Sequence, residues 1–420
     1  GLETPMTVHF ALPKILTRAP VPGVRAFAFL AGIEAVVRGM VLSVYPLMMY
    51  RAYGDAAVVS QYYFVVGLLS LITALLVPLA TRWVPRRWVY SFGVSLYLVG
   101  AGLAVWGGAL TVLALLCHAT ATAIAFVCFN AYVLDNITKS DLGRLESLRM
   151  FYGGIGWTVG PMLGVWLLQF WQGAPFLMSG AAACFMLGSF WFLRMGNGRV
   201  IARARVASPN PFAYLMRFFA QPRLVAGWAF AVLRSCGWWV YIVYVSIFAV
   251  EAGLGEKVGG VTTSLANMTL FLSPLMLRWI QGRSVRVAVR TGFMACALCF
   301  TAGTLFSPLP WLTVAVLMLG AFFLVLLDIC GGLPFLMSVK PSERTEMSAV
   351  YSSFRDVSGI VTPGVAWIVL QFAPVAAIFA ACGLGLFCAW YLAGNLHPQL
   401  GLSGAERARL RMGPPIGPGL

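Results

Sequence analysis

The sequence RLESLRMFYGGIGWTVGPMLGVWLLQF, residues 144–170, returns in a weaker form as RTEMSAVYSSFRDVSGIVTPGVAWIVLQF, residues 344–372. In both copies a charged stretch leads into a long apolar segment, which carries small residues around one proline and ends in Gln-Phe. The corresponding residues are Arg144, Glu146, Pro161, Gln169 and Phe170 in the first copy and Arg344, Glu346, Pro363, Gln371 and Phe372 in the second. A chain assembled from two copies of one helical unit accounts for this repeat.

The composition predicts that this unit lies in a bilayer. Hydrophobic residues make up 60% of the chain and charged residues 10%, with a mean hydropathy of +0.86. A spanning helix needs about 20 apolar residues. The sequence contains twelve such runs, at 25–50, 56–80, 87–108, 109–134, 147–171, 174–194, 223–250, 258–281, 286–306, 309–336, 347–371 and 373–394. We therefore predict an all-α integral membrane protein with two bundles of six helices.

The formal charge of +16 reports topology rather than nucleic-acid binding. Most basic residues follow the even-numbered runs or occupy the central loop, whereas the alternate loops hold only Arg51 and Lys257. The basic positions include Arg82, Arg86, Arg87, Lys139, Arg144, Arg199, Arg278, Arg283, Arg286, Arg290, Lys340, Arg344 and Arg355. By the positive-inside rule both termini are cytoplasmic. We expect a multi-pass protein of a bacterial inner membrane.

The same pattern sets the domain boundaries. We predict a cytoplasmic N-terminal segment at 1–24, with 1–5 (GLETP) as a cloning remnant, and a first bundle at 25–195. A basic linker follows at 196–222, with a short amphipathic helix at 212–219, then a second bundle at 223–394 and a cytoplasmic tail at 395–420. A monomer is expected.

Several function classes find no support in the residues. The nine cysteines lie mostly inside apolar runs without a CxxC motif, and the histidines and methionines lack metal-ligand spacing, so no metal site is predicted. No catalytic constellation and no phosphate-binding Gly-x-x-x-x-Gly-Lys-[Ser/Thr] loop occurs, so neither an enzyme nor a bound cofactor is expected. Any active process would therefore use an ion gradient.

Four charged residues lie inside the predicted spans. Glu34 and Arg38 are four apart in the first run, and so share a helix face, while Arg234 and Asp328 lie in the seventh and tenth runs. A charge inside the membrane costs about 2.5–3.5 kcal/mol on insertion scales, and it normally faces a partner or a polar cavity. Either each acid neutralises an arginine, or Glu34 and Asp328 carry protons while Arg38 and Arg234 bind an anionic substrate.

Polar and aromatic residues near these charges complete the candidate binding set. His118 and Asn130 lie within the fourth run, and Trp238 and Tyr241 follow Arg234 in the seventh. A lone histidine in a span serves either as a hydrogen-bonded packing residue or as a substrate ligand. The sequence leaves both interpretations of His118 open.

Two motifs resemble the major facilitator superfamily. The turn after the second run, ATRWVPRRW at 80–88, matches the arginines of the family's loop motif through Arg82, Arg86 and Arg87. Thr81 stands where the family has an aspartate. The resemblance implies two six-helix bundles related by an axis along the membrane normal. It also implies that the first, fourth, seventh and tenth helices line a central cavity.

The fifth run carries the second motif, Gly156-x-x-x-Gly160-Pro161-x-x-Gly164. Small residues at this spacing allow a neighbouring helix to approach closely, and the proline removes one backbone hydrogen bond. The pattern resembles the antiporter motif of proton-coupled exporters in the superfamily.

These observations favour a secondary transporter that works by alternating access. The predicted partners are a small organic anion or zwitterion, protons and membrane lipids, and the expected process is proton-coupled export. Two alternatives stay open, namely proton-coupled uptake of an organic anion and a non-transporting membrane assembly protein of the same fold.

Overall fold

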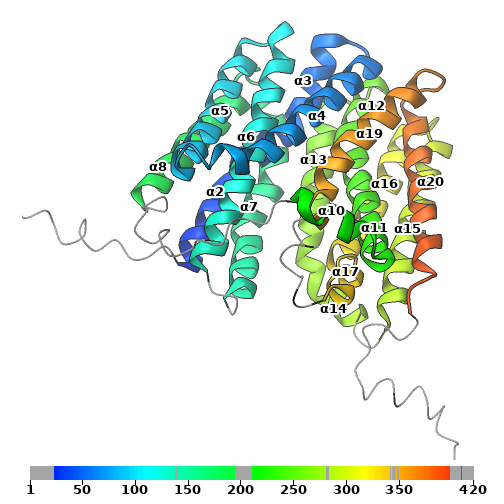
Figure 1. The fold of residues 1–420 in the computed structure, drawn as a ribbon. Helices are drawn as coiled ribbons and strands as arrows, with labels where there is room; N and C mark the ends of the chain where they lie inside the picture. Colours follow the sequence, from blue (N-terminus) through cyan, green and yellow to red (C-terminus); the bar gives the residue numbers. More distant parts are fainter. Residues whose placement is uncertain are drawn as a thin grey trace, which may run out of the picture.

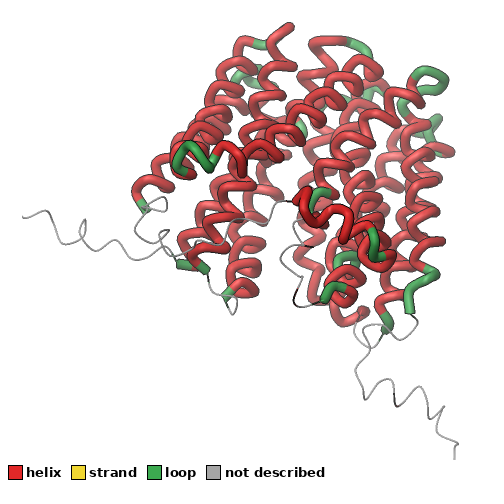
Figure 2. Tube along the Cα trace, viewed as in Figure 1, coloured by secondary structure: helices red, strands yellow, loops and turns green. Residues whose placement is uncertain are grey.

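The computed structural model describes residues 23–137, 141–193, 211–280, 283–340, 342, 347, 350–397 and 408. Within this part of the chain every regular element is a helix, and Figure 2 shows no strand. Residues 1–22, the linker up to residue 210 and the tail beyond residue 397, apart from residue 408, lie outside the described residues. The same holds for Lys139, Arg199, Arg344 and Glu346.

Two groups of helices lie side by side in Figure 1. The first half consists of α2 (Val24–Leu42), α3 (Val44–Tyr53), α4 (Ala56–Ala80), α5 (Arg86–Trp106), α6 (Thr111–Asn136), α7 (Leu142–Leu168) and α8 (Ala174–Phe192). The second half consists of α10 (Pro211–Phe219), α11 (Pro222–Trp239), α12 (Val245–Glu251), α13 (Lys257–Met268), α14 (Ser273–Ile280), α15 (Val285–Leu305), α16 (Pro310–Cys330), α17 (Leu333–Ser338), α19 (Phe354–Leu370) and α20 (Ala376–Ala393).

These helices account for the twelve predicted spans. Eleven helical segments of the described chain are long and apolar enough to cross a membrane. The remaining predicted run, 347–371, contains α19, which has 17 residues. Large apolar side chains such as Phe92, Phe185 and Leu384 are mostly exposed on the outside of the bundle. A bilayer would cover them, so the predicted all-α membrane fold is confirmed.

Several spans are irregular in ways that hydropathy does not reveal. The first breaks at Ser43 between α2 and α3, and the seventh passes through a π-helical turn, η2 (Val240–Tyr244), between α11 and α12. The eighth contains a 3-10 segment, η3 (Thr269–Leu272), between α13 and α14. Such segments interrupt the regular hydrogen-bond ladder and often mark functional positions within a helix.

Local sequence signals set the helix ends. Gly54 has φ = +67° and ends α3, because a left-handed residue after a helix is easiest for glycine. Asp55 then caps α4 by accepting a hydrogen bond from the Ala57 N–H at 3.0 Å. Ser284 caps α15 in the same way through the Val287 N–H at 3.3 Å. These caps place sharp turns between antiparallel neighbours.

The two halves are joined at one end of the molecule. We call this the joined end; α3 and α12 lie there, at the top of Figure 1, and the arginine-rich turns after α4 and α14 lie at the other, basic end. One apolar cluster contains residues of both halves, with Met48 and Tyr63 beside Tyr244 and Phe248, and it continues along α15 of the second half as far as Val285. A second cluster, around Phe129, belongs to the first half alone.

Polar contacts cross between the halves at the joined end as well. Arg51 pairs with Glu256, and the Tyr50 hydroxyl donates to Glu251 Oε1 at 3.0 Å. Deeper in the bundle, the side chains of four hydroxyl-bearing residues meet in pairs, Ser43 with Thr263 at 3.3 Å and Ser60 with Tyr244 at 2.8 Å. The joined end is therefore held by a few polar contacts laid over an apolar layer.

Candidate functional site

Glu34 begins a chain of hydrogen bonds that crosses three helices of the first half. The Tyr97 hydroxyl, from α5, lies 3.5 Å from Glu34 Oε1 and 2.9 Å from Thr122 Oγ1. Thr122 in turn donates to the backbone carbonyl of His118, one turn earlier on α6, at 2.9 Å. The half-buried carboxyl of α2 is thus connected to α5 and α6 through hydroxyl groups that can donate or accept a proton.

Arg38 points to a different neighbour. Its guanidinium lies 5.1 Å from the ring centroid of Trp157 on α7, a cation–π arrangement. Among the ion pairs of the described residues, none joins Glu34 to Arg38. The four-residue spacing puts both on one helix face, yet Glu34 reaches α5 while Arg38 reaches α7. The structure does not show the direct pair that one interpretation of the sequence required.

The second half contains a charged pair in direct contact. Arg234 Nε, on α11, lies 3.1 Å from Asp328 Oδ1, on α16. The Trp238 indole N–H approaches both carboxylate oxygens, at 3.2 and 3.0 Å. The Arg234 side chain is 11% exposed and the Asp328 side chain 37%. Asp328 is therefore bound on one side by two donors and remains open on the other.

The sequence missed an arginine between the halves. Arg355 of α19 was counted among the loop charges, but its guanidinium lies 4.9 Å from the ring of Phe126 on α6 and 5.7 Å from the ring of Phe354. Its contact with α6 crosses from one half to the other. Because Arg355 follows a basic loop in the sequence, its contact with the other half was not predicted.

The remaining predicted binding residues are separated by the structure. The His118 ring packs between the rings of Tyr45 and Tyr97, with both centroids 5.1 Å away. Asn130 lies twelve residues farther along α6, about 18 Å toward the basic end. Tyr241 is fully buried, and its hydroxyl donates to the Thr262 carbonyl at 2.8 Å. Trp238 thus stays beside the charges, whereas Tyr241 packs against α13.

The glycines of the fifth-run motif bring α7 against α2. A Cβ at Gly156 would lie 2.8 Å from the Ala35 carbonyl carbon, and one at Gly160 would lie 2.7 Å from that of Gly39. A Cβ at Gly164 would collide with the Met40 carbonyl oxygen. Side chains larger than hydrogen do not fit between these backbones. The motif therefore fixes α7 against the helix that carries Glu34 and Arg38.

Pro161 provides a link from α7 to the other half. Proline has no N–H and displaces the carbonyl four residues earlier, so the Trp157 carbonyl loses its partner within the helix. Asn267 of α13 donates to this carbonyl at 2.7 Å. One residue after the proline, the Met162 N–H approaches Ser264 Oγ at 2.9 Å. Neighbouring side chains commonly satisfy backbone groups that proline frees in membrane helices.

The second copy of the repeat occupies the equivalent position with different chemistry. On α19, Ser358 Oγ lies 2.7 Å from Ser235 Oγ of α11, so this helix packs against the arginine-bearing helix of its own half. Pro363 frees the Gly359 carbonyl, and Gly67 of α4 lies against that oxygen, where a Cβ would be only 2.7 Å away. In this copy a close contact with Gly67 takes the place of the hydrogen bond that Asn267 donates in the first copy.

The arginine turn after α4 is anchored within the first half. Arg86 Nη1 lies 2.5 Å from Asp135 Oδ2 near the end of α6, and its guanidinium is 5.2 Å from the Tyr132 ring. Arg82 is exposed and Arg87 half-buried. An aspartate from another helix thus contacts this motif, although Thr81 occupies the family's aspartate position.

No group of three or more potential metal ligands occurs in the described part of the chain. The residues that sequence reasoning missed are Tyr97, Thr122, Trp157, Asn267 and Arg355. Asn267 gave the clearest signal, because an amide inside an apolar run requires a partner.

Comparison with known proteins agrees with this architecture. The profile of the Major Facilitator Superfamily matches residues 27–363, so the chain belongs to that family. An uncharacterised MFS-type transporter of Escherichia coli (strain K12), YdeE, is 24% identical over 276 residues, which cover 62% of this chain and 66% of that protein. The chain is thus a multi-pass membrane transporter of this superfamily.

Solved structures of the same fold include transporters with different substrates. A mutant of the nucleoside transporter NupG has a TM-score of 0.67 and 14% identity, covering 88% of this chain and 100% of that one. The D-xylose-proton symporter has a TM-score of 0.66 and 11% identity, covering 89% and 97%. At these identities the likeness shows the fold alone.

Proposed function

We propose that this protein exports a small organic anion or zwitterion from a bacterial cytoplasm in exchange for protons. Glu34 and Asp328 are assigned as proton carriers, and Arg38, Arg234 and Trp238 as substrate contacts. The positive-inside rule supports placing the basic end in the cytoplasm. With the opposite end joined, this structure corresponds to a conformation closed toward the outside.

The observation that carries the proposal is the unequal partnering of the two arginines. Arg234 is held by Asp328, whereas Arg38 lies against Trp157 and forms no ion pair with a carboxylate of the described residues. A proton that enters at the exposed side of Asp328 would remove its charge and release the Arg234 guanidinium. A guanidinium binds carboxylate or phosphate groups through two parallel hydrogen bonds. Protonation of Asp328 thus favours anion binding at Arg234, so this pair couples the proton to the anion but does not by itself give the direction of transport.

The α7 motif supports export as the direction. Gly156 and Gly160 hold α7 on α2, and Asn267 holds α7 on the second half. Helix α7, which carries the antiporter-like motif, thus connects α2, the helix of Glu34, to the second half. Proton-coupled uptake would use the same charges but would bind the proton and the anion together, whereas exchange requires that they bind in turn. Direct measurement of the transport direction separates the two.

Transport in proteoliposomes tests the proton carriers. Glu34→Gln and Asp328→Asn should abolish transport driven by a pH gradient while counterflow of labelled substrate continues, because exchange needs no net proton movement. Arg223→Ala, at an exposed position, is the matched charge control. Gradient-driven transport at the wild-type rate in either acid variant would remove that residue from the mechanism.

Ligand-induced thermal stabilisation tests the substrate class. A panel of anionic, neutral and cationic metabolites should stabilise the purified protein selectively, because ligands that bind only the folded state raise its stability. Anions or zwitterions should give the largest shifts, and Arg38→Ala or Arg234→Ala should reduce them. Stabilisation by cations alone, unchanged in both variants, would refute the anion assignment. Absence of any transport despite binding would favour the assembly role.

A further inference from the structure

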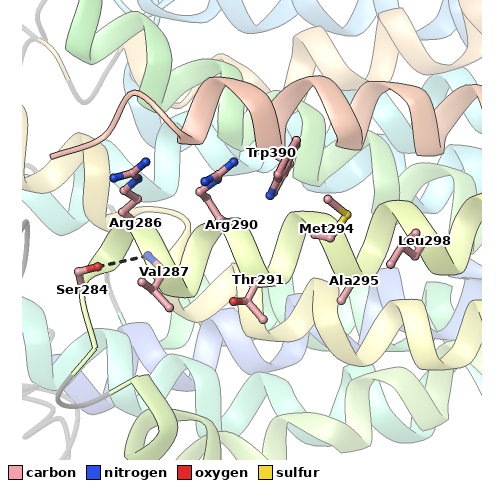
Figure 3. A pocket seen from close by; sticks show the side chains of 9 residues that line it. All are labelled: Ser284, Arg286, Val287, Arg290, Thr291, Met294, Ala295, Leu298 and Trp390. Carbon is pink, nitrogen blue, oxygen red and sulfur yellow. Dashed lines mark hydrogen bonds between the residues drawn. The ribbon is translucent and has the colours of Figure 1, made fainter. Parts of the chain in front are cut away.

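A groove between α15 and α20 lies outside the site described above. Its volume is about 550 Å³, and it is lined mainly by one face of α15 together with Trp390 of α20. Figure 3 shows Arg286 and Arg290 projecting from α15 toward α20, with Met294 and Leu298 farther along the same helix. The spacing of four residues places these side chains in one row.

The groove is cationic at one end. None of its nine lining residues is acidic, while Arg286 and Arg290 both contribute a positive charge and Ser284 and Thr291 contribute hydroxyl groups. The Arg290 guanidinium lies 4.3 Å from the Trp390 ring, yet its Nε is buried without a hydrogen-bond partner. Two guanidinium groups in a groove whose lining contains no acidic residue favour an anionic ligand.

The groove is apolar at the other end. Its walls there are Met294, Ala295 and Leu298, and the Leu298 side chain is 56% exposed. Arg290 is the sixth residue of α15, within about 8 Å of the helix start at the basic end, whereas Leu298 lies about 20 Å along. The arginines thus lie at headgroup depth and the apolar walls at the depth of acyl chains.

We propose that this groove binds an anionic phospholipid, with the phosphate between Arg286 and Arg290 and an acyl chain along Met294 and Leu298. A phosphodiester supplies acceptors for the N–H groups of the two guanidinium ends. Basic pockets between membrane helices recognise anionic headgroups in this manner. Along α15 the side chains of this row change from charged to apolar, just as a phospholipid changes from its charged headgroup to its apolar acyl chains.

Titration of the detergent-purified full chain with defined lipids tests this site. Dioleoylphosphatidylglycerol should raise the melting temperature more than dioleoylphosphatidylcholine does. At about 1 kcal/mol per arginine near the membrane surface, Arg286→Gln should weaken the apparent lipid affinity about 5-fold and the Arg286→Gln/Arg290→Gln double variant about 30-fold. Arg278→Gln, at an exposed position on α14, should leave lipid binding unchanged.

Three outcomes would overturn the proposal. Equal stabilisation by the zwitterionic lipid would show that charge is not recognised, and undiminished binding in Arg286→Gln would exclude that side chain. Inorganic phosphate that produces the same stabilisation as the lipid would show a soluble-anion site. The Arg286 side chain forms no hydrogen bond or ion pair with the described residues, so its variant separates binding from folding even if the double variant misfolds. The readout is independent of transport.

Discussion

Replacing Asn267 by leucine should weaken the contact between the halves, because the Trp157 carbonyl would lose the donor that Pro161 makes necessary. The bond is 2.7 Å long and joins α13 to α7. Hydrogen bonds between membrane helices average about 0.6 kcal/mol and reach about 1.7 kcal/mol. We expect a loss of about 1 kcal/mol, since this carbonyl also lacks an intrahelical partner.

A double-mutant cycle isolates this effect. Pro161→Ala restores an N–H at residue 161, which can bond the Trp157 carbonyl within α7. In that background Asn267→Leu should cost almost nothing, which gives a coupling energy of about 1 kcal/mol. Unfolding in mixed SDS and maltoside micelles provides the four free energies.

Asn130→Leu is the control for Asn267→Leu, because it also removes an amide from a span. Asn130 lies in a span, and no hydrogen bond from its side chain is found among the described contacts, so Asn130→Leu should neither destabilise the protein nor couple to Pro161→Ala. Additive effects of Asn267→Leu and Pro161→Ala, within about 0.3 kcal/mol, would refute the reasoning.

Three further changes test other contacts. Gly160→Ala should lower the free energy of unfolding by about 1–3 kcal/mol, because the added methyl group overpacks the contact with α2. Gly154→Ala is the control and should be neutral or stabilising, because its Cβ would have no atom within 4 Å. Glu256→Gln removes the exposed ion pair with Arg51. It should change the ratio of the populations with the joined end open and closed by up to about 5-fold, which distances between spin labels across that end can measure. Asp135→Asn removes the negative charge that pairs with Arg86 at the α4–α5 turn and should lower the free energy of unfolding by about 1–3 kcal/mol.

Hydropathy predicted the helices well because a span must be long and apolar whatever surrounds it. The run 56–80 coincides with α4, and 25–50 differs from the Val24–Tyr53 span by a few residues at its end. The interruptions at Ser43 and at Val240–Tyr244 were not predicted. They depend on neighbours from other helices, which no local pattern encodes.

The charged residues were found easily, but their partners were not. A charge inside an apolar run stands out, whereas the direction of its side chain depends on which helix lies beside it. Arg234 and Asp328 lie 94 positions apart and meet, while Glu34 and Arg38 share a helix face and point to different helices. The sequence left pairing open for both acids, and the structure shows a direct ion pair for Asp328 with Arg234.

The energetics of the joined end suit a protein that changes conformation. Its outer polar contacts, between Arg51 and Glu256 and between Tyr50 and Glu251, are exposed, and such contacts contribute about 0–1 kcal/mol each. By contrast, the glycine contacts hold α7 to α2 backbone against backbone, so these helices would move as a unit. The exposed polar contacts of the joined end can therefore open at small cost, whereas the buried contacts between the halves, such as Gly67 against the Gly359 carbonyl, hold more firmly. A ligand that prefers one arrangement by a few kcal/mol can then shift the population, and two arginines with unequal partners offer that preference.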